Sequence, residues 1–171
     1  LGLLKEERFN PGRRLTEEVV EWAYAVEFRQ LPPHVIDAVK FYAIDFLASA
    51  VPGVCREEEG DRGGLRATLE FVKELKCPGP STVIGTNFRT LPQYAALISG
   101  AASGAYELDA THRNALPSHN ALPVYAAAFA ISEMAPTDFN NFATGVAVAC
   151  EVETKLSMSL NPGIGCIDPS Q

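Results

Sequence analysis

The segment Ala95–Ala105 consists almost entirely of alanine, glycine and serine, and it constrains the fold more than any other part of the sequence. Pro92 suits the first turn of a helix, and the apolar spacing predicts a helix over Gln93–Leu108. Within that helix, Gly100 and Gly104 would each cost up to ~1 kcal/mol relative to alanine. Close packing against neighbouring helices must offset this cost, so we expect the segment at the centre of a helical bundle.

Apolar residues recur every three or four positions in five further segments, as they do on the buried face of a helix. The clearest repeat covers Val35–Leu47, and Pro52 and Gly53 are expected to end that helix. A short run, Thr82–Gly85, is expected to form an isolated strand or an extended connection. The predicted helices besides the small-residue one cover residues 16–28, 33–51, 65–75, 123–134 and 139–160. The sequence therefore predicts an all-α fold, a bundle of about six helices.

The length of 171 residues suits one domain. Residues 1–14 are expected to be a flexible lead-in, residues 15–160 a helical domain, and residues 161–171 an irregular tail rich in proline and glycine. Hydrophobic residues make up 47% of the chain, which is enough to build a core and excludes disorder for most of it.

The charge balance excludes one class of partner. A net charge of −7 makes the chain a poor nucleic-acid binder, because affinity for nucleic acid rests largely on neutralisation of phosphates by lysine and arginine. The longest apolar runs, such as Ala121–Ile131, are shorter than the ~20 residues that span a bilayer, so no membrane segment is expected. The N-terminal residues show no signal-peptide pattern.

The four cysteines lie far apart in the sequence, at Cys55, Cys77, Cys150 and Cys166. None of their spacings matches a metal-ligand motif. They are interpreted as buried free thiols in a reducing compartment, which favours the cytoplasm, with the mitochondrion as the alternative.

One segment concentrates the polar chemistry of the chain. It carries Glu107, Asp109, Thr111 and His112, and His119 follows shortly after, so two of the three histidines lie here. Connections held between rigid helices often carry binding and catalytic residues. A histidine beside a carboxylate can exchange protons near neutral pH, because the carboxylate fixes its tautomer and raises its basicity.

Several alternatives to a catalytic site remain open at this stage. Asp109 and Thr111 could be ordinary residues of a helix end and a turn, and the histidines could simply be exposed. A zinc site formed by Asp109, His112 and His119 is another possibility, although the spacing differs from the i, i+4 pairs of helical zinc motifs. Further along, Glu151 and its charged neighbours are expected on a solvated face, with an inward-facing Glu151 as the alternative.

Four stretches, in order, carry a resemblance to a known family. They are Leu31–Ala48, with its Leu-Pro-Pro opening; Ser81–Thr86, which reads Ser-Thr-Val-Ile-Gly-Thr; the small-residue stretch that enters Glu107-Leu-Asp109; and Gly145–Lys155, with its Cys-Glu-Val-Glu core. The sequence thereby resembles the MmgE/PrpD family of 2-methylcitrate dehydratases and cis-aconitate decarboxylases. The resemblance covers about residues 15–160.

The resemblance implies a helical domain that meets a branched di- or tricarboxylic acid and removes water or carbon dioxide from it without a metal or an organic cofactor. Carried over position by position, Glu107 and Asp109 match acidic positions, Thr111 a hydroxyl position and His119 a downstream histidine. His112 matches a histidine found in some members. Asp109, Thr111, His112 and His119 are thus expected to be catalytic, and Glu107 to bind substrate. A homodimer is also implied.

The sequence departs from the family pattern in three ways. Ala110 stands where a second adjacent aspartate is common, and the segment between Thr111 and His119 is a residue or two longer than usual. Relatives also continue into a further histidine, a lysine-bearing helix and a lid domain. We therefore expect a truncated member. The alternatives are a catalytically inactive helical remnant that acts through packing or dimerisation, and a helical scaffold unrelated to the family.

Overall fold

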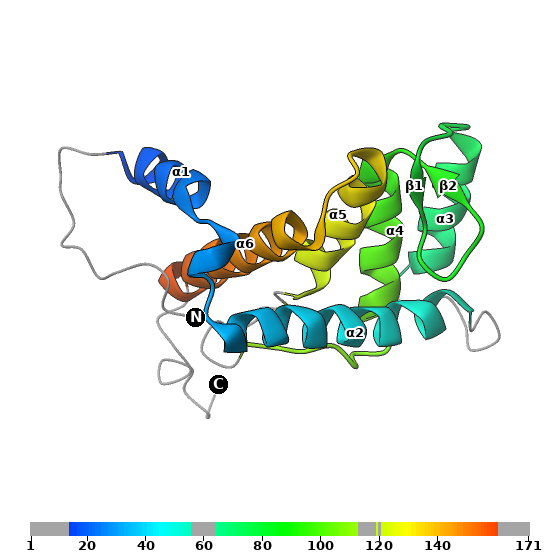
Figure 1. Ribbon diagram of the computed structural model, residues 1–171. Helices are drawn as coiled ribbons and strands as arrows, with labels where there is room; N and C mark the ends of the chain where they lie inside the picture. Colours follow the sequence, from blue (N-terminus) through cyan, green and yellow to red (C-terminus); the bar gives the residue numbers. More distant parts are fainter. Residues whose placement is uncertain (1–13, 56–63, 113–118, 120, 161–171) are drawn as a thin grey trace, which may run out of the picture.

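The computed structural model describes residues 14–55, 64–112, 119 and 121–160. In these ranges the chain forms six α-helices, one short 3-10 helix and two strands of two residues each (Figure 1). The elements are α1 (Leu15–Ala25), η1 (Phe28–Gln30), α2 (Pro33–Cys55), α3 (Leu65–Glu74), β1 (Ser81–Thr82), β2 (Arg89–Thr90), α4 (Pro92–Gly104), α5 (Ala121–Met134) and α6 (Phe139–Leu160). The predicted all-α class is confirmed. The predicted lead-in and tail lie outside the described residues, apart from Arg14.

Helix α4, the small-residue helix, lies at the centre of the bundle and packs against α2, α3 and α5. Its Ala95, Ile98 and Ala102 are fully buried. A side-chain carbon placed on Gly100 would lie 3.5 Å from the Ala126 side chain of α5. The small side chains therefore let the helices approach closely, as the composition predicted.

Helix α2 continues to Cys55 instead of ending at Val51, so the predicted boundary was wrong. Pro52 lies in the last turn, where its missing amide removes only one hydrogen bond of the helix. Gly53 is needed because α4 crosses there. A side-chain carbon on Gly53 would lie 1.9 Å from the backbone oxygen of Ala102.

Two other predicted boundaries need correction. The first predicted helix divides into α1, which ends at Ala25, and the separate turn of η1. Helix α4 ends at Gly104, four residues before the predicted end, and Ala105 already belongs to its C-terminal cap. After Gly104 the chain leaves the helix through a turn at residues 105–107.

The strand predicted over Thr82–Gly85 lies at Ser81–Thr82 instead and is one half of a small antiparallel hairpin, in which Ser81 pairs with Thr90. The buried hydroxyl of Ser81 donates to the carbonyl of Ala130 in α5, at 2.6 Å. The Thr82 hydroxyl donates to the Glu133 carboxylate at 2.8 Å. The hairpin is thereby fixed to α5, and its second strand had no signal in the sequence.

The main core lies where α2, α5 and α6 meet. Phe46 of α2 stacks on Tyr125 and Phe129 of α5, with ring centroids 6.2 Å and 5.9 Å apart. The Tyr125 hydroxyl is buried and donates to the backbone oxygen of Val39 at 2.6 Å. This contact fixes α5 against α2.

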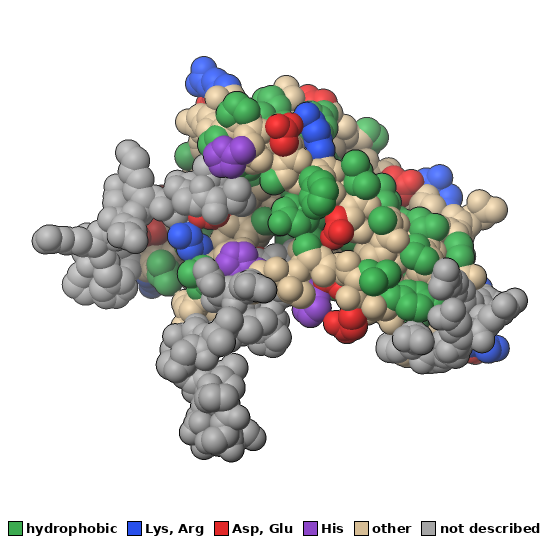
Figure 2. Space-filling model, turned by 90° about the horizontal axis from the view of Figure 1, so that it is seen from below, with side chains coloured by type: hydrophobic (Ala, Val, Ile, Leu, Met, Phe, Trp, Pro, Cys, Tyr) green, Lys and Arg blue, Asp and Glu red, His purple; other side chains and the backbone are tan. Residues whose placement is uncertain are grey.

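Helix α2 is long and apolar enough to cross a membrane by length and composition, which the inspection of apolar runs had missed. One such helix is weak evidence for a membrane span, because core helices and signal sequences pass the same test. Val35, Val39 and Phe46 of α2 are buried in the core, although only 22% of its most apolar stretch is buried. The opposite side of α2 exposes Phe41 and Ile44. Figure 2, which views the molecule from the α2 side, shows hydrophobic side chains spread across this surface.

Candidate active site

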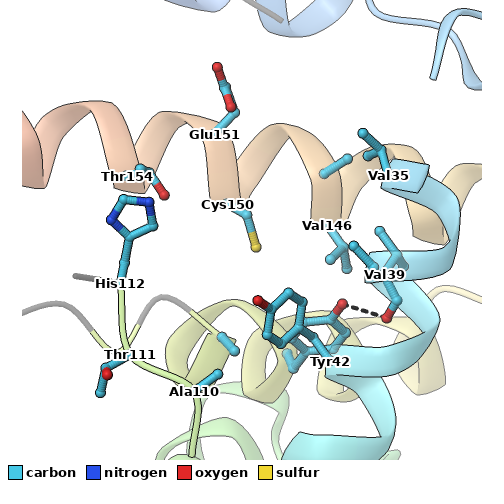
Figure 3. A pocket seen from close by; sticks show the side chains of 14 residues that line it. Val35, Val39, Tyr42, Ala110, Thr111, His112, Val146, Cys150, Glu151 and Thr154 are labelled. Atoms are coloured by element: carbon cyan, nitrogen blue, oxygen red, sulfur yellow. Dashed lines mark hydrogen bonds between the residues drawn. The ribbon is translucent and has the colours of Figure 1, made fainter. Parts of the chain in front are cut away.

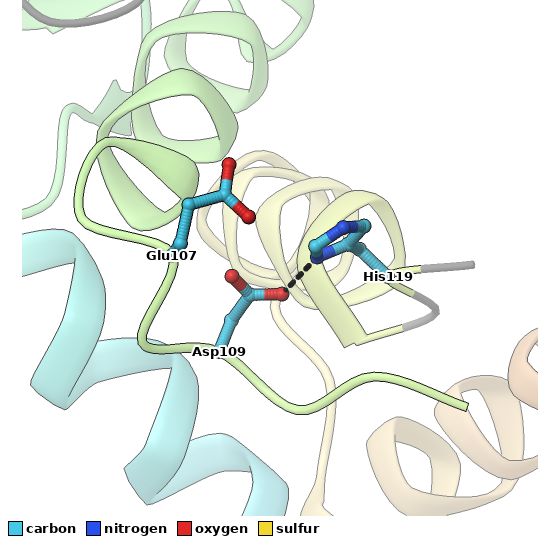
Figure 4. A group of neighbouring side chains, drawn as sticks. All are labelled: Glu107, Asp109 and His119. Carbon is cyan, nitrogen blue, oxygen red and sulfur yellow. Dashed lines mark hydrogen bonds and ion pairs between the residues drawn. The ribbon is translucent and has the colours of Figure 1, made fainter. Parts of the chain in front are cut away.

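The candidate site begins in the turn that ends α4. Glu107 has a φ of +52°, the left-handed conformation that side-chain-bearing residues rarely adopt. Its amide donates to the Gly104 carbonyl at 3.2 Å and closes the turn. The chain then reverses, so that Glu107 and Asp109 face the start of α5 instead of continuing along α4 (Figure 4).

Asp109 and His119 form the central contact of the site. His119 Nδ1 lies 2.6 Å from Asp109 Oδ2, and the Asp109 side chain is only 1% exposed, against 35% for His119. An ionised carboxylate can only accept a hydrogen bond, so Nδ1 of His119 carries the proton and donates it. In the neutral ring, Nε2 is then left as an acceptor, which is the atom a general base uses.

The position of His119 is fixed at its backbone as well as at its ring. The amide of Leu122, in the first turn of α5, donates to the His119 carbonyl at 3.0 Å. His119 is therefore attached to the beginning of a rigid helix, whereas Asp109 follows the end of another. The hydrogen bond between Asp109 and His119 thus connects the chain after α4 to the start of α5.

The second carboxylate oxygen of Asp109 is buried and has no hydrogen-bond partner in the described part of the chain. A buried polar atom left without a partner costs about 1–3 kcal/mol. A ligand that donates a hydrogen bond to Oδ1 would remove this cost. The atom is therefore a natural contact point for a hydroxyl or a protonated carboxyl group.

Glu107 completes a three-residue cluster, in which one oxygen of Glu107, one of Asp109 and one nitrogen of His119 all lie within 4.8 Å of one another. Two carboxylates and an imidazole are also a donor set that could hold a divalent metal. The zinc alternative from the sequence named His112 in place of Glu107, and that ligand set is wrong because His112 lies elsewhere.

A residue that the sequence did not single out holds the site segment in place. The amide of Ala110 donates to Oδ2 of Asp45, on α2, at 3.2 Å. Asp45 interrupts an otherwise apolar run of that helix, between Ile44 and Phe46. A single acidic residue within an apolar run was the available signal in the sequence. The hydrogen bond to Ala110 gives Asp45 a role in positioning residues 109–111.

Thr111 and His112 line a pocket beside the cluster instead of joining it. The pocket has a volume of about 260 Å³ and lies between α2, α6 and the segment 110–112. Figure 3 shows His112 extending from this segment toward α6. Residues of both helices and of α5 complete the wall: Val35, Ala38, Val39, Tyr42, Ala110, Ala121, Tyr125, Val146, Ala147, Cys150, Glu151 and Thr154.

Glu151 is buried, with 2% exposure, so its expected position on a solvated face was wrong and the inward-facing alternative is confirmed. Its Oε1 lies 3.9 Å from Nζ of Lys155, one turn further along α6. The preceding residue, Cys150, points into the pocket (Figure 3). Burial, with a smaller contribution from the charge of Glu153, raises the pKa of the Cys150 thiol from 9.0 to about 12. The thiol is neutral at physiological pH and adds to the apolar wall.

The comparison with protein families decides the assignment. The sequence profile of the MmgE/PrpD N-terminal domain matches residues 17–164. The chain belongs to the MmgE/PrpD family. This match covers all of the elements from η1 to α6 and all but the first two residues of α1, and it includes the whole candidate site, so the resemblance drawn from the four stretches is confirmed.

Named relatives of this MmgE/PrpD chain include two fungal proteins. A cis-aconitate decarboxylase of Aspergillus terreus is 32% identical over 125 residues, which cover 73% of this chain and 24% of that protein. The cis-aconitate decarboxylase-like protein oryM of Aspergillus oryzae is 29% identical over 124 residues, or 72% of this chain and 24% of the relative. The chain thus spans about a quarter of the length of these relatives. No solved structure matches it significantly.

Proposed function

We propose that this MmgE/PrpD chain carries the acid–base wall of a lyase that removes water or carbon dioxide from a branched di- or tricarboxylic acid. The observation that carries the proposal is the contact between Asp109 and His119, with Nδ1 and Oδ2 at 2.6 Å. Two relatives bear names that refer to cis-aconitate decarboxylase, which supports the same reaction class.

In this mechanism His119 moves the proton. For a dehydration, Nε2 takes the proton from the carbon next to a carboxylate, and the resulting imidazolium returns this proton to the hydroxyl group on the adjacent carbon, which leaves as water while the carbon–carbon double bond forms. For a decarboxylation, the bond to the departing carboxylate breaks, and the remaining electron pair on carbon takes a proton from the imidazolium. In both cases Asp109 holds the ring in one tautomer and stabilises its charged form.

Glu107 is assigned to substrate binding. Its carboxylate oxygen lies within 4.8 Å of the reacting pair and can accept a hydrogen bond from a substrate hydroxyl or a protonated carboxyl group. Thr111, from the neighbouring pocket wall, supplies a hydroxyl that can donate to a substrate carboxylate. No metal or organic cofactor enters the proposed reaction.

The test compares the purified chain with a His119→Ala variant, using cis-aconitate and 2-methylcitrate in separate reactions. Proton NMR follows the loss of substrate, and released carbon dioxide is measured in parallel. His34→Ala is the matched control, because His34 is exposed in the first turn of α2 and lies outside the site. We expect turnover by the chain and by His34→Ala, and at least a hundredfold slower turnover by His119→Ala, the range attributed to one general base. Equal rates in all three proteins would refute the acid–base assignment.

A second candidate function is a catalytically inactive helical remnant that acts by dimerisation. The observation in its favour is the exposed apolar side of α2, where Phe41 is 66% and Ile44 is 67% exposed. Two large apolar side chains on one helix face favour burial against another surface. Absence of turnover, combined with a dimer that Phe41→Glu converts to a monomer, would support this function. Phe71→Glu, on the exposed side of α3, is the control for added charge.

A further inference from the structure

The pocket beside the Asp109–His119 pair has the character of a site for a hydrocarbon group. From this we infer that the preferred substrate is a di- or tricarboxylic acid with an alkyl substituent of several carbons, and that the substituent occupies the pocket between α2, α6 and residues 110–112. This inference rests on the proposed function and specifies the substrate class for it. It makes Ala38, Val39 and Val146 specificity-determining residues.

The pocket and the acid–base pair share the same two segments of chain. Ala110 lines the pocket and directly follows Asp109, while Ala121 lines it from the start of α5, two residues after His119. A molecule with its carboxylates at the pair can therefore extend an attached group into the pocket. The hydrogen bond from the Ala110 amide to Asp45 holds this part of the pocket lining against α2.

The interior of the pocket is largely apolar, while the hydroxyl groups of Tyr42, Thr111 and Thr154 belong to its lining. Val35, Val39 and Val146 are buried hydrophobic residues of α2 and α6. The Tyr125 hydroxyl already donates to the Val39 carbonyl, so this polar group is not available to a ligand. None of the described residues that line the pocket is a lysine or an arginine. A second carboxylate here would lose its hydration without gaining a cation.

The lining contains one carboxylate, Glu151, which is 2% exposed and ion-paired with Lys155. Figure 3 shows this side chain on the side of α6 opposite to Cys150, pointing away from the pocket, so its charge does not face an occupant. The thiol of Cys150 also faces the pocket, and it is a small apolar group in its neutral form. The surface chemistry of the lining thus favours an apolar occupant.

The pocket is partly open to the surface, so its size shows what length of substituent it can hold and does not set an upper limit. Its volume is about 260 Å³. An apolar cavity of ~150 Å³ is known to hold benzene, which has six carbons. A linear or branched group of about six carbons therefore fits, whereas a single methyl group would leave most of the space unfilled.

The lining of the pocket also contains a polar atom that could contact a carboxyl group of the proposed substrate. His112 Nδ1 is buried and has no hydrogen-bond partner within the described residues. Its ring stands between the site segment and α6 (Figure 3). A carboxyl group can donate to this atom or accept from it, depending on the tautomer. The arrangement therefore presents polar contacts at one side of the pocket and apolar contacts in its interior.

The experiment measures binding by isothermal titration calorimetry for the full chain and a series of 2-alkylsuccinates, from methyl through butyl to hexyl. Each methylene that enters the pocket should strengthen binding about fourfold, the transfer free energy of one buried methylene group. The Ala38→Phe variant fills the pocket from α2 and should abolish this dependence on chain length. Ala48→Phe, at an exposed position of the same helix outside the pocket, should retain it.

A second measurement uses only the unmodified chain, so that it holds even if Ala38→Phe fails to fold. Methyl NMR resonances of Val35, Val39 and Val146 should shift with the hexyl compound and stay nearly unchanged with the methyl compound. Equal affinity across the series, absence of binding by every member, or identical dependence in the two alanine variants would overturn the inference.

Failure of this inference and failure of the proposed function give different results. The titrations and NMR shifts report binding without turnover, whereas the proposed function depends on the rate lost in His119→Ala. Turnover of compact acids with a flat chain-length series would refute the alkyl pocket and leave the acid–base assignment intact. Affinity that rises strongly with alkyl chain length, together with unchanged turnover in His119→Ala, would refute the acid–base assignment and leave the alkyl pocket intact.

Discussion

His119 Nδ1 lies 2.6 Å from Asp109 Oδ2, and the carboxylate that accepts this hydrogen bond is almost completely buried. The buried carboxylate dictates which ring nitrogen carries the proton. The more exposed imidazole presents the other nitrogen to the surface. The contact with Asp109 thus leaves Nε2 of His119 as the nitrogen that can accept a proton.

Replacing the carboxylate of Asp109 by an amide, in Asp109→Asn, should reverse the tautomer of His119. The amide NH₂ group would donate to Nδ1, and the proton would move to Nε2, where a base is needed. We expect the turnover rate to fall by about 10²- to 10⁴-fold, in line with the effect of the same change in other aspartate–histidine pairs. Steady-state kinetics with cis-aconitate or 2-methylcitrate measure the effect. The same change at Asp37, an exposed residue of α2 paired with Lys40, should have no effect on turnover.

Asp45→Ala should lower activity although Asp45 does not contact the acid–base pair. It removes the acceptor of the Ala110 amide, which lets the site segment shift. We expect kcat to fall about tenfold with a loss of stability of about 1 kcal/mol. Asp45→Asn retains an acceptor oxygen and should restore most of the rate. A purely structural role would instead change stability in both variants and leave kcat proportional to the folded fraction.

Gly53→Ala and Gly145→Ala form a matched pair that tests the crossing of α2 and α4. The added methyl group at Gly53 would meet the Ala102 backbone oxygen at 1.9 Å, whereas nothing lies within 4 Å of the one at Gly145. Gly53→Ala should lower the free energy of unfolding by about 3 kcal/mol or more. Gly145→Ala, within α6, should raise it by up to ~1 kcal/mol. Urea unfolding followed by circular dichroism distinguishes the two outcomes. Similar stability of both variants would contradict the close approach of the helices.

Alkaline pH should destabilise the fold through Cys150. Its pKa in the folded chain is about 12, raised from 9.0. Between these values the unfolded chain releases the proton and the folded chain keeps it, so stability is complete below pH 9 and declines as the pH rises. The loss should reach about 1–2 kcal/mol near pH 10.5. Burial also raises the pKa of Tyr125, which adds a loss of the same sign at higher pH.

The check is urea unfolding at several pH values between about 7 and 10.5. Cys150→Ala should flatten the decline in stability, and Cys55→Ala, at an exposed position, should leave it unchanged. A decline that is identical in the two variants would show that Cys150 is not responsible.

The fold class could be predicted from the sequence because closely packed helices require small residues where they meet, and such residues are visible in the composition. The glycine and alanine residues of α4 suit close contact with α2 and α5, and this arrangement is what the structure contains. The approach of Asp109 to His119 was expected only as a proximity of suitable residue types. Their hydrogen bond depends on where α4 ends, and helix ends are set by tertiary contacts as much as by local sequence.

Other features depend on partners that are distant in the sequence. Asp45 and Ala110 are 65 residues apart, and no local pattern links them. The left-handed conformation of Glu107 had no signal either, because that conformation is usually occupied by glycine. For Glu151, its charge suggested exposure, while its place after an apolar run suggested burial. The packing of α6 against the other helices decided between the two.

The Asp109–His119 contact also has a consequence for how the chain between these residues can vary. Asp109 and His119 are ten positions apart in the sequence. The entropy cost of closing a flexible loop grows only with the logarithm of its length, so two more residues raise it by about 0.2 kcal/mol. Insertions of this size are therefore nearly neutral for the pair. The number of residues between Asp109 and His119 therefore constrains their contact less than the identity of the two side chains does.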